Sequence, residues 1–393
     1  MKLLSKTIKE TIIKYNFLGI HFSIKNKQHY NKLKIESNEA KIQQDLYDLS
    51  NLQNAEKLIL FLIQSDIKTN GGIMSIFSLC QTSRKLNTDS VCILSTYPNA
   101  KYTHAKNETF PNEEQIYRFS QIVDNCKNLK EMIIHIPEYY AKQFYKNLTK
   151  KDIEFLKSIK SLQLNILNQN IELMPKPKKW HNLYKLTNNI TQTIAHNRYA
   201  TQEVCNKYKI PTHLFSVNFD LSKYKKYPFE EKEKIIVLSP DENSYKSQIV
   251  KKLKAELPDW QFITVQSMTF PQYMDLVGKA YFTITFGEGM DGYFSQPVYV
   301  KSLGFAVYND KFFPNNSWKN LKNVYSSYEK MEENICNDLK MLYSNKDLYY
   351  LSIQEHLNKI HEFYNINNYL SNIERFYKKE YDFYPECNIN KTG

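Results

Sequence analysis

The sequence is poor in the features that break a chain or carry it through a membrane. It has 9 glycines and 13 prolines among 393 residues, too few for long low-complexity linkers. No stretch approaches the roughly 20 apolar residues of a membrane-spanning helix. The first residues also lack the apolar core of a signal peptide, because Lys6, Lys9, Glu10 and Lys14 interrupt it. These absences favour a globular, cytoplasmic protein of two domains of ordinary size.

The cysteines are few and scattered. They form no Cys-x-x-Cys pair and stand at Cys80, Cys92, Cys126, Cys205, Cys336 and Cys387. In a chain of this length without a signal, such a distribution indicates reduced thiols. A structural zinc site is not expected, because its ligands usually come in closely spaced pairs.

Positive charge is in excess. The net charge of +12 suits nucleic acid, an anionic membrane surface or phosphorylated substrates. Residues 1–34 hold eight lysines against the single acid Glu10, and Leu3–Leu18 places apolar residues at roughly helical spacing. We therefore expect residues 1–45 to form a basic helical segment. It would lie either on an anionic membrane or, as a solvated helix, on the body of the protein.

Short apolar runs alternate with amphipathic stretches along the rest of the chain. The first group of runs predicts strands at Lys57–Gln64, Ser90–Ser95, Glu131–Ile136, Leu162–Leu167, Ile190–Ala195 and Thr212–Val217. After the irregular stretch Phe219–Lys234 the pattern restarts, with strands expected at Lys234–Leu238, Trp260–Val265, Tyr281–Phe286, Leu303–Asn309 and Asn323–Ser326. This alternation indicates two α/β domains with parallel sheets, followed by helices over Met331–Lys378.

Ligands of open parallel sheets bind beyond the carboxyl ends of the strands, so the residues that follow each strand are candidates. Gly71 and Gly72 allow close approach to the backbone before a helix whose N–H groups can meet an anion. A Gly-Gly pair is also simply a turn between strand and helix. Ser239 and Lys246 follow the first strand of the second domain, where the ammonium can meet a phosphate. The alternative is a solvated lysine at the start of a helix.

The loop Thr285–Pro297 is the strongest candidate. It contains a third of the glycines, at Gly287, Gly289 and Gly292. Glu288 and Asp291 stand directly beyond a very apolar strand, and buried strand ends rarely keep an acid without a partner. A carboxylate there can accept hydrogen bonds from two adjacent hydroxyls, as in the recognition of ribose or a sugar. These features favour a binding site over a turn with incidental acids.

The same residues carry a resemblance to a family. The run ITFGEGMDGYFSQP, followed by SLGFAVYND, resembles the donor-binding segment of retaining GT-B glycosyltransferases related to family 4. KLILFLIQSDIKTNGGIMSIFSLC and TQTIAHNRYATQEVCNKYKIPTHLFSVNFD resemble the family's first strand with its Gly-rich loop and its entry into the interdomain linker. The resemblance implies two Rossmann-like domains that face each other across a cleft. The acceptor domain would span 46–220 and the donor domain 221–345, with C-terminal helices at 346–393 that pack back on the first domain.

The resemblance also implies site residues. Two glutamates separated by seven residues mark the family; Glu288 falls on the first, beside the reacting sugar, and Gln296 replaces the second, which holds the ribose. Catalytic roles follow for Glu288, His196 and Asn168. Donor binding follows for Gly71, Gly72, Ser239, Lys246, Gly287, Gly289, Asp291, Gly292, Tyr293 and Gln296. A second departure is that only Lys246 matches the family's Arg and Lys pair for the diphosphate. A lone histidine beside a strand, such as His135 or His196, is usually structural.

The implied activity is the transfer of a sugar, with retention, from a nucleotide-sugar donor to a glycan or lipid-linked saccharide. A growing capsule, lipopolysaccharide or similar surface polysaccharide is the expected product, made at the inner face of the cytoplasmic membrane. The chain has no Asp-x-Asp, so no metal or other cofactor is expected. Three alternatives stay open. They are a nucleic-acid binder, for which no RRM, KH loop or paired-Cys finger is present, a non-catalytic GT-B-like binding subunit, and another GT-B chemistry such as polyol-phosphate transfer.

Overall fold

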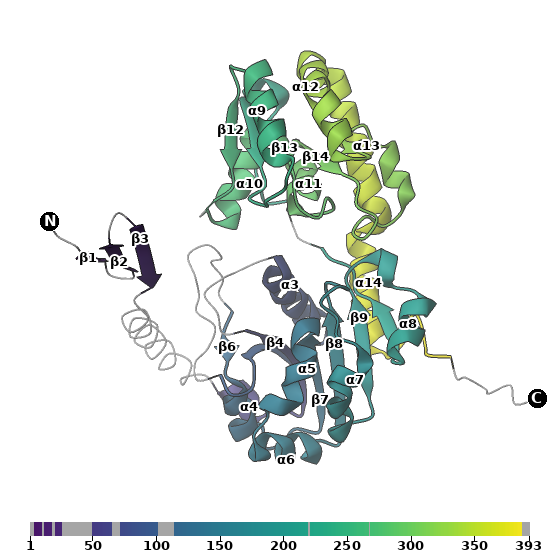
Figure 1. Cartoon of the computed structure of the whole chain (residues 1–393). Helices are drawn as coiled ribbons and strands as arrows, with labels where there is room; N and C mark the ends of the chain where they lie inside the picture. Colours follow the sequence, from purple (N-terminus) through teal and green to yellow (C-terminus); the bar gives the residue numbers. More distant parts are fainter. Residues whose placement is uncertain are drawn as a thin grey trace, which may run out of the picture.

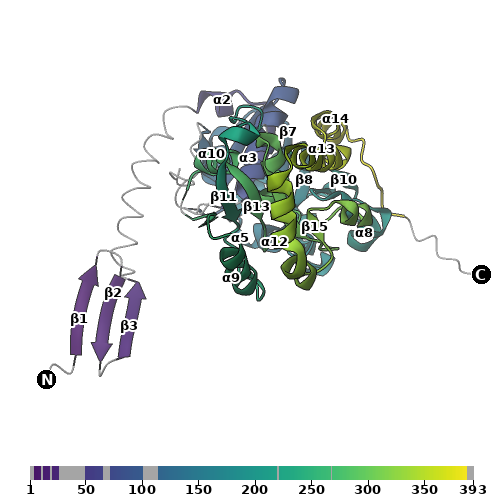
Figure 2. The same cartoon turned by 90° about the horizontal axis from the view of Figure 1, so that it is seen from above.

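Two parallel sheets, each covered by helices, form the body of the protein. The computed structural model describes residues 4–9, 12–17 and 20–25 by their backbone, and residues 49–64, 71–100, 114–218, 221–266 and 268–386 in full. The domains are stacked: they are separate in the view of Figure 1 and overlap when seen from above in Figure 2. None of the described helices is long and apolar enough to cross a membrane.

The first domain has a seven-stranded sheet. Its order is β10-β9-β8-β7-β4-β5-β6, and every neighbouring pair is parallel. The strands are β4 (Lys57–Ile63), β5 (Val91–Thr96), β6 (Ile116–Tyr117), β7 (Glu131–Pro137), β8 (Ser161–Asn168), β9 (Ile190–Ile194) and β10 (Thr212–Leu214). All the strands expected before residue 219 are present, and the two-residue β6 is additional.

Alternating side chains of β4 supply both faces of this sheet. Leu58, Leu60 and Leu62 pack in the core under α4 (Phe119–Asn125), α5 (Glu138–Asn147) and α6 (Lys150–Ser158). Ile59 and Phe61 pack on the opposite face with α3 (Gly71–Leu86). A strand buried on both faces reads as a continuous apolar run, which is why KLILFLI could be recognised. Shorter helical elements complete the domain: α2 (Ser50–Gln53), α7 (Pro177–Trp180), η1 (His181–Lys185), η2 (Asn197–Tyr199) and α8 (Gln202–Tyr208).

The second domain has a five-stranded parallel sheet in the order β12-β11-β13-β14-β15. Its strands are β11 (Glu233–Leu238), β12 (Gln261–Thr264), β13 (Ala280–Ile284), β14 (Leu303–Val307) and β15 (Val324–Tyr325). Ile236 and Leu238 face a core shared with α9 (Lys246–Glu256) and α12 (Tyr328–Ser344). Ile235 and Val237 face α10 (Phe270–Lys279) on the other side. The remaining short elements are η3 (Phe229–Glu231), α11 (Gly292–Ser295), η4 (Pro297–Val300) and η5 (Asn316–Asn320).

The C-terminal helices divide between the domains. α13 (Lys346–Phe363) places Tyr349, Ile353 and Ile360 in the core of the second domain. α14 (Ile366–Tyr377) returns to the first sheet, where Tyr369 and Ile373 pack with α3; Figure 1 shows this helix in yellow beside β9. The return therefore begins at α14 and not at residue 346, because the apolar stripe of α13 is used by the second domain. Two α/β domains joined by a linker and a returning helix confirm the expected GT-B fold.

The N-terminal expectation needs a correction. In place of a helix, the structure has three antiparallel strands: β1 (Leu4–Lys9), β2 (Ile12–Phe17) and β3 (Ile20–Lys25). Isoleucine and aromatic residues are frequent in this stretch, and Ile20, Phe22 and Ile24 alternate with polar residues. A period of two and β-branched residues favour strands over a helix. The rest of the expected segment, through residue 45, lies outside the described residues.

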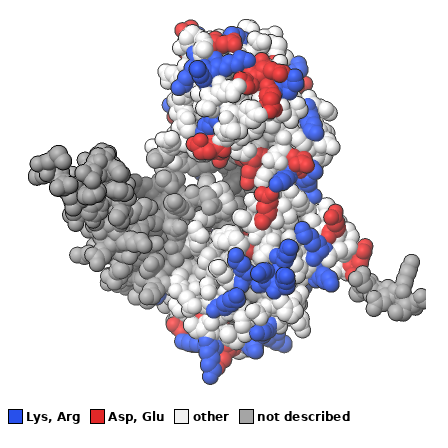
Figure 3. Space-filling model, viewed as in Figure 1, with Lys and Arg blue, Asp and Glu red and all other residues white. Residues whose placement is uncertain are grey.

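Charge is unevenly distributed over the surface. In the view of Figure 3, Lys and Arg side chains gather over the first domain, where α5 and α7 lie in Figure 1. Acidic side chains lie along the boundary between the domains in the same view.

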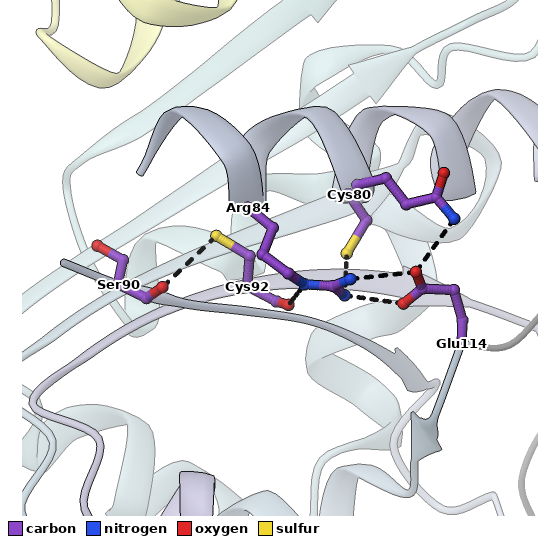
Figure 4. Close-up of polar contacts among 6 residues, drawn as sticks. Cys80, Arg84, Ser90, Cys92 and Glu114 are labelled. Atoms are coloured by element: carbon purple, nitrogen blue, oxygen red, sulfur yellow. Dashed lines mark hydrogen bonds and ion pairs between the residues drawn. The ribbon is translucent and has the colours of Figure 1, made fainter. Parts of the chain in front are cut away.

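A polar cluster around the half-exposed Arg84 and the buried Glu114 fixes α3 against β5 and the segment before β6 (Figure 4). The Arg84 guanidinium makes two hydrogen bonds to the Glu114 carboxylate, at 3.1 and 2.8 Å, and its Nε donates to the Cys92 carbonyl at 3.1 Å. Burial raises the pKa of the Cys92 thiol to about 12 and also raises the pKa of the Cys80 thiol. The five described cysteines are buried and free, so these two act as packing groups.

Candidate functional site

Both sheets present a topological switch point to the space between the domains. In the second sheet β11 lies between β12 and β13, so the next two strands along the chain lie on opposite sides of β11. The order of this sheet, 2-1-3-4-5, is one in which ligands bind beyond the strands that flank the switch. The loops after β11 and β13 contain Lys246 and Glu288. The first sheet has its switch between β4 and β7, which brings Gly71 and Glu138 to the same edge.

Glu288 is exposed at the tip of the loop after β13. Partial burial raises the pKa of its carboxyl, and the charges of Asp241 and of Glu172 in the first domain raise it further. The flanking glycines are required by sterics. A Cβ on Gly287 would lie 2.8 Å from a carboxylate oxygen of Asp241, and one on Gly289, where φ is +85°, would lie 2.5 Å from the Val307 carbonyl. The loop therefore holds Glu288 out toward the first domain.

Asp291 is placed differently from Glu288. Its carboxylate accepts hydrogen bonds from the backbone N–H groups of Tyr293 (2.8 Å) and Phe294 (3.1 Å), and from the Thr285 hydroxyl. It is thus the N-cap of α11. Burial raises its pKa to about 7, although these hydrogen bonds lower it. Tyr293 packs edge-on against Tyr273, with ring centroids 5.4 Å apart. Both residues hold the shape of the loop.

Ser239 and Lys246 join the two loops of the second sheet. The buried Ser239 hydroxyl accepts a hydrogen bond from the Phe286 N–H at 2.9 Å. The Lys246 ammonium donates to the carbonyls of Ser239 (2.9 Å) and Asp241 (2.7 Å) and lies 5.7 Å from the centre of the Phe286 ring. Two of its three hydrogens are used in this way. Lys246 is thereby fixed at the switch point.

In the first domain, Gly71 and Gly72 form the first turn of α3, and the residues before them, 65–70, lie outside the described residues. A Cβ on Gly71 would meet nothing within 4 Å, so open space surrounds it. The Gly72 carbonyl accepts a hydrogen bond from the Gln169 side chain at 3.1 Å. The start of this 16-residue helix, where backbone N–H groups have no partner within the helix, lies at the edge that faces the second domain.

The predicted catalytic residues of the first domain are not equivalent. Asn168 is buried within the sheet at the end of β8, where it contacts Gln192 at 3.4 Å and its Oδ1 has no partner among the described residues. His196 lines a cavity between the domains, and burial lowers its pKa. His135 is wholly buried and stacks on Phe61 with ring centroids 4.3 Å apart. His135 is therefore a structural residue.

The cavity lies between the linker, the loop after β13 and the end of α13. Its volume is about 170 Å³, and its lining includes His196, Asn218, Gln296 and Tyr364. A Cβ on Gly292 would lie 3.0 Å from the Gln296 side chain, so that side chain packs directly over α11. Within the described part of the chain, the side-chain amide of Gln296 and the hydroxyl of Tyr364 have no hydrogen-bond partner. Polar groups without partners are available to a ligand here.

The domains touch beside this cavity. Lys311 Nζ lies 2.6 Å from Glu172 Oε1, and the His196 ring lies 6.1 Å from the Phe312 ring. Arg198 donates a long hydrogen bond of 3.5 Å to the Phe313 carbonyl. These contacts hold the loops after β8 and β9 opposite the loop after β14.

Three acids of this region were not among the predicted site residues. Asp241 packs against Gly287, Glu172 raises the pKa of Glu288, and Glu138 is buried at the end of β7. Glu138 accepts a hydrogen bond from the Gln169 N–H at 3.3 Å, and burial raises its pKa to about 7. Its place directly after a strand was the signal available in the sequence. Among the residues that the structure describes, no group of three His, Cys, Asp or Glu side chains is placed to hold a metal ion.

Comparison with known proteins gives structural similarity alone. No protein-family model and no curated protein matches the sequence. Among solved structures, Anabaena HepE in complex with UDP and glucose is 10% identical with a TM-score of 0.49, and the alignment covers 82% of this chain and 100% of that chain. Sucrose-phosphate synthase from Thermosynechococcus elongatus is 7% identical with a TM-score of 0.49, covering 82% and 98%. The wall teichoic acid polymerase TagF is 10% identical with a TM-score of 0.43, covering 89% and 95%. At such scores these similarities carry no functional conclusion.

Proposed function

We propose that this protein is a glycosyltransferase that uses a nucleotide-sugar donor. One observation carries the proposal: the switch point of the second sheet brings a fixed cation, Lys246, and an exposed carboxylate, Glu288, to the edge that faces the first domain. A nucleotide sugar has a diphosphate and a sugar that becomes positively charged as its bond to phosphate breaks. A cation for the former and a carboxylate for the latter are the groups that this chemistry needs.

Each proposed role follows from the position of the group. Lys246 would contact the diphosphate with its remaining hydrogen, and the N–H groups at the start of α3 would face it from the first domain. Glu288 would lie beside the sugar. Gln296 would bind the ribose hydroxyls in the cavity, since an amide both donates and accepts. His196 would lie on the acceptor side. Asn168 is buried, with its Oδ1 unpartnered among the described residues, and its catalytic role stays a prediction.

The finer features of the reaction rest on the sequence resemblance. We propose a retaining, metal-independent transfer to a glycan or lipid-linked saccharide of a surface polysaccharide, such as a capsule or lipopolysaccharide. The enzyme would work in the cytoplasm, at the inner face of the membrane.

The decisive experiment combines nucleotide binding with donor turnover. A ligand that binds the native state alone raises the melting temperature, so UDP or GDP should stabilise the protein while an oligonucleotide should not. Hydrolysis of a panel of nucleotide sugars would then identify the donor. Lys246→Ala should lower the affinity for the nucleoside diphosphate by roughly 10-fold or more, which is the contribution of one charged hydrogen bond. Lys251→Ala on the same helix is the matched control, because Lys251 is exposed. Equal affinities of the two variants would contradict the role of Lys246.

A second function has specific support. Gln296 is uncharged, and Lys246 already donates to two carbonyls. Both features suit a subunit that binds a nucleotide or carbohydrate without turning it over. Stabilisation by a nucleotide sugar, with no hydrolysis or transfer from any donor, would favour this binding subunit over the enzyme.

A further inference from the structure

One face of the first domain carries positive charge without any acid. It is formed by α5, α7 and η1, and we name it the lysine face. Its exposed cations are Lys142, Lys146, Lys176, Lys178, Lys179 and Lys185. The segments 139–149 and 173–187, which form this face, contain no Asp or Glu. None of the six ammonium groups has a carboxylate partner among the residues that the structure describes. Figure 3 shows this gathering of basic side chains on the first domain.

The three elements form one continuous surface. On α5 the exposed residues Tyr139, Lys142 and Lys146 recur at a spacing of three to four, which places them on one stripe of the helix. Lys185 of η1 lies 5.3 Å from the centre of the Tyr145 ring of α5, so the two elements are adjacent. Elsewhere some lysines lie against acids, as Lys151 does against Asp124 and Lys340 against Glu256. What distinguishes this face is that six exposed lysines gather in segments that contain no acid.

Apolar side chains lie at the cleft end of the lysine face. Leu173 is 53% exposed and Tyr139 is 36% exposed. The hydrogen bond from the Gln169 N–H to Glu138 joins the loop that contains Leu173 to the start of α5, which contains Tyr139. Leu173 also follows Glu172, which contacts Lys311 of the second domain. A basic surface edged by exposed apolar residues is the combination that binds an anionic bilayer, where lysines meet the headgroups and apolar side chains enter the interface.

We propose that the lysine face docks on an anionic phospholipid bilayer and holds the opening between the domains next to it. The exposed apolar residues beside the lysines favour a bilayer over nucleic acid, because a bilayer has an apolar phase for them to enter. Docking itself does not depend on the activity of the protein. The delivery of a lipid-linked acceptor to the cleft, in contrast, rests on the proposed function.

The test uses full-length protein and flotation with vesicles of phosphatidylcholine containing phosphatidylglycerol. Lysines near such a surface contribute about fivefold each to partitioning, less at high salt. The combined variant Lys176→Gln, Lys178→Gln and Lys179→Gln should therefore bind on the order of 100-fold more weakly. The control Lys251→Gln, Lys254→Gln and Lys322→Gln removes the same charge from exposed lysines of the second domain and should bind as wild type. Leu173→Ser should lower binding several-fold without any change of charge.

Each outcome decides the proposal. All variants retain residues 1–34, so equal binding of wild type and the Lys176 triple variant would overturn it and assign any membrane affinity to another part of the chain. Equal losses in the variant and the control would show attraction by net charge alone. If the Lys176 variant loses an oligonucleotide but keeps the vesicles, the face binds nucleic acid and the proposal fails. Turnover of a soluble donor should be unchanged in the variant, so this test is separate from that of the proposed function.

Discussion

The Nδ1 of His213 lies 2.9 Å from the Oδ2 of Asp382. This contact joins the edge strand β10 to residues 378–386, which follow α14 and which we name the C-terminal arm. The other ring nitrogen, Nε2, lies 2.7 Å from the Asn372 carbonyl, which can only accept a hydrogen bond. Asp382 also accepts from the Leu214 N–H at 2.8 Å and pairs with Arg375 at 2.9 Å. The buried ring thus lies between the Asp382 carboxylate and the Asn372 carbonyl, and the cluster fastens the returning helix α14 to the first sheet.

Loss of this cluster should be measurable in the free energy of unfolding. Burial opposes the ionisation of Asp382, but its hydrogen bonds to His213 and Leu214 outweigh it and lower the pKa to about 2. A lowered acid pKa contributes stability above the ordinary value near 4, and this contribution is lost as the pH falls through 2. Asp382→Asn should cost roughly 1.5–3 kcal/mol at pH 7 in chemical denaturation, and less at pH 2.5. Glu380→Gln, an exposed acid of the same arm, is the control. An equal cost at both pH values would contradict this account.

Asp291 should show the opposite pH dependence. Its pKa is raised to about 7 by burial, so the folded state favours the protonated carboxyl. The contribution to stability is complete below the ordinary pKa near 4 and is lost as the pH rises through 7. Asp291→Asn keeps an acceptor for the N-cap of α11 and cannot ionise. The variant should be as stable as wild type at pH 3.5 and more stable by at least about 1 kcal/mol at pH 8. A variant that is less stable at pH 8 would show that the ionised form is the one the loop requires.

Much of the architecture could be predicted because both sheets are buried on both faces. The runs KLILFLI and AYFTI each contain a single polar residue, Lys57 or Thr283, so their strands stand out from the amphipathic helices. The order of the strands could not be obtained this way. The loops that flank a switch point are known only once the strands beside β4 and β11 in the sheets are known. For this reason Glu138 and Asp241 were not predicted as site residues.

The remaining differences have local causes. The apolar stripes of α13 and α14 have the same helical spacing, and which domain each one covers depends on partners distant in sequence. At the N-terminus, apolar residues fit helical spacing in part and alternation in part, and the pairing of β1, β2 and β3 decides between them. Asn168 stands at a strand end as expected, but its side chain is enclosed by the sheet.

The catalytic proposal depends most directly on Glu288. Glu288→Gln removes the negative charge beside the developing positive charge while keeping the shape of the side chain. Turnover of the identified donor should fall by roughly 10²–10³-fold, the effect of one electrostatic contact. The melting temperature should be unchanged, since Glu288 is exposed. Full transferase activity at unchanged stability would remove Glu288 from the site.

The pH dependence of turnover tests the surroundings of Glu288. Burial and the charges of Asp241 and Glu172 raise the pKa of its carboxyl, and turnover needs the ionised form. Activity should therefore rise as the pH increases through this raised pKa. Asp241→Asn removes one neighbouring negative charge, so the acidic limb of the kcat/KM profile should move to lower pH. The exposed Glu242→Gln next to it should leave the limb in place. A limb that does not move in Asp241→Asn would mean that another group controls it.

Gln296→Glu separates an active enzyme from a binding subunit. The side chain lines the cavity and packs over Gly292, close to the Asp291 N-cap, and Glu keeps its shape. By resemblance, a carboxylate here would accept hydrogen bonds from both ribose hydroxyls, which the amide can only partly replace. Activity should be unchanged or raised, and any increase should come from a lower KM for the donor. Because the pKa of the neighbouring Asp291 is about 7, Asp291 is mostly uncharged at pH 6 and disfavours a second charge at pH 8, so any gain should be larger at pH 6 than at pH 8. If wild type turns over no donor and Gln296→Glu creates turnover, the natural chain is a binding subunit. If Gln296→Glu abolishes the activity of an active wild type, the amide itself is the recognition group and the assigned ribose contact is wrong.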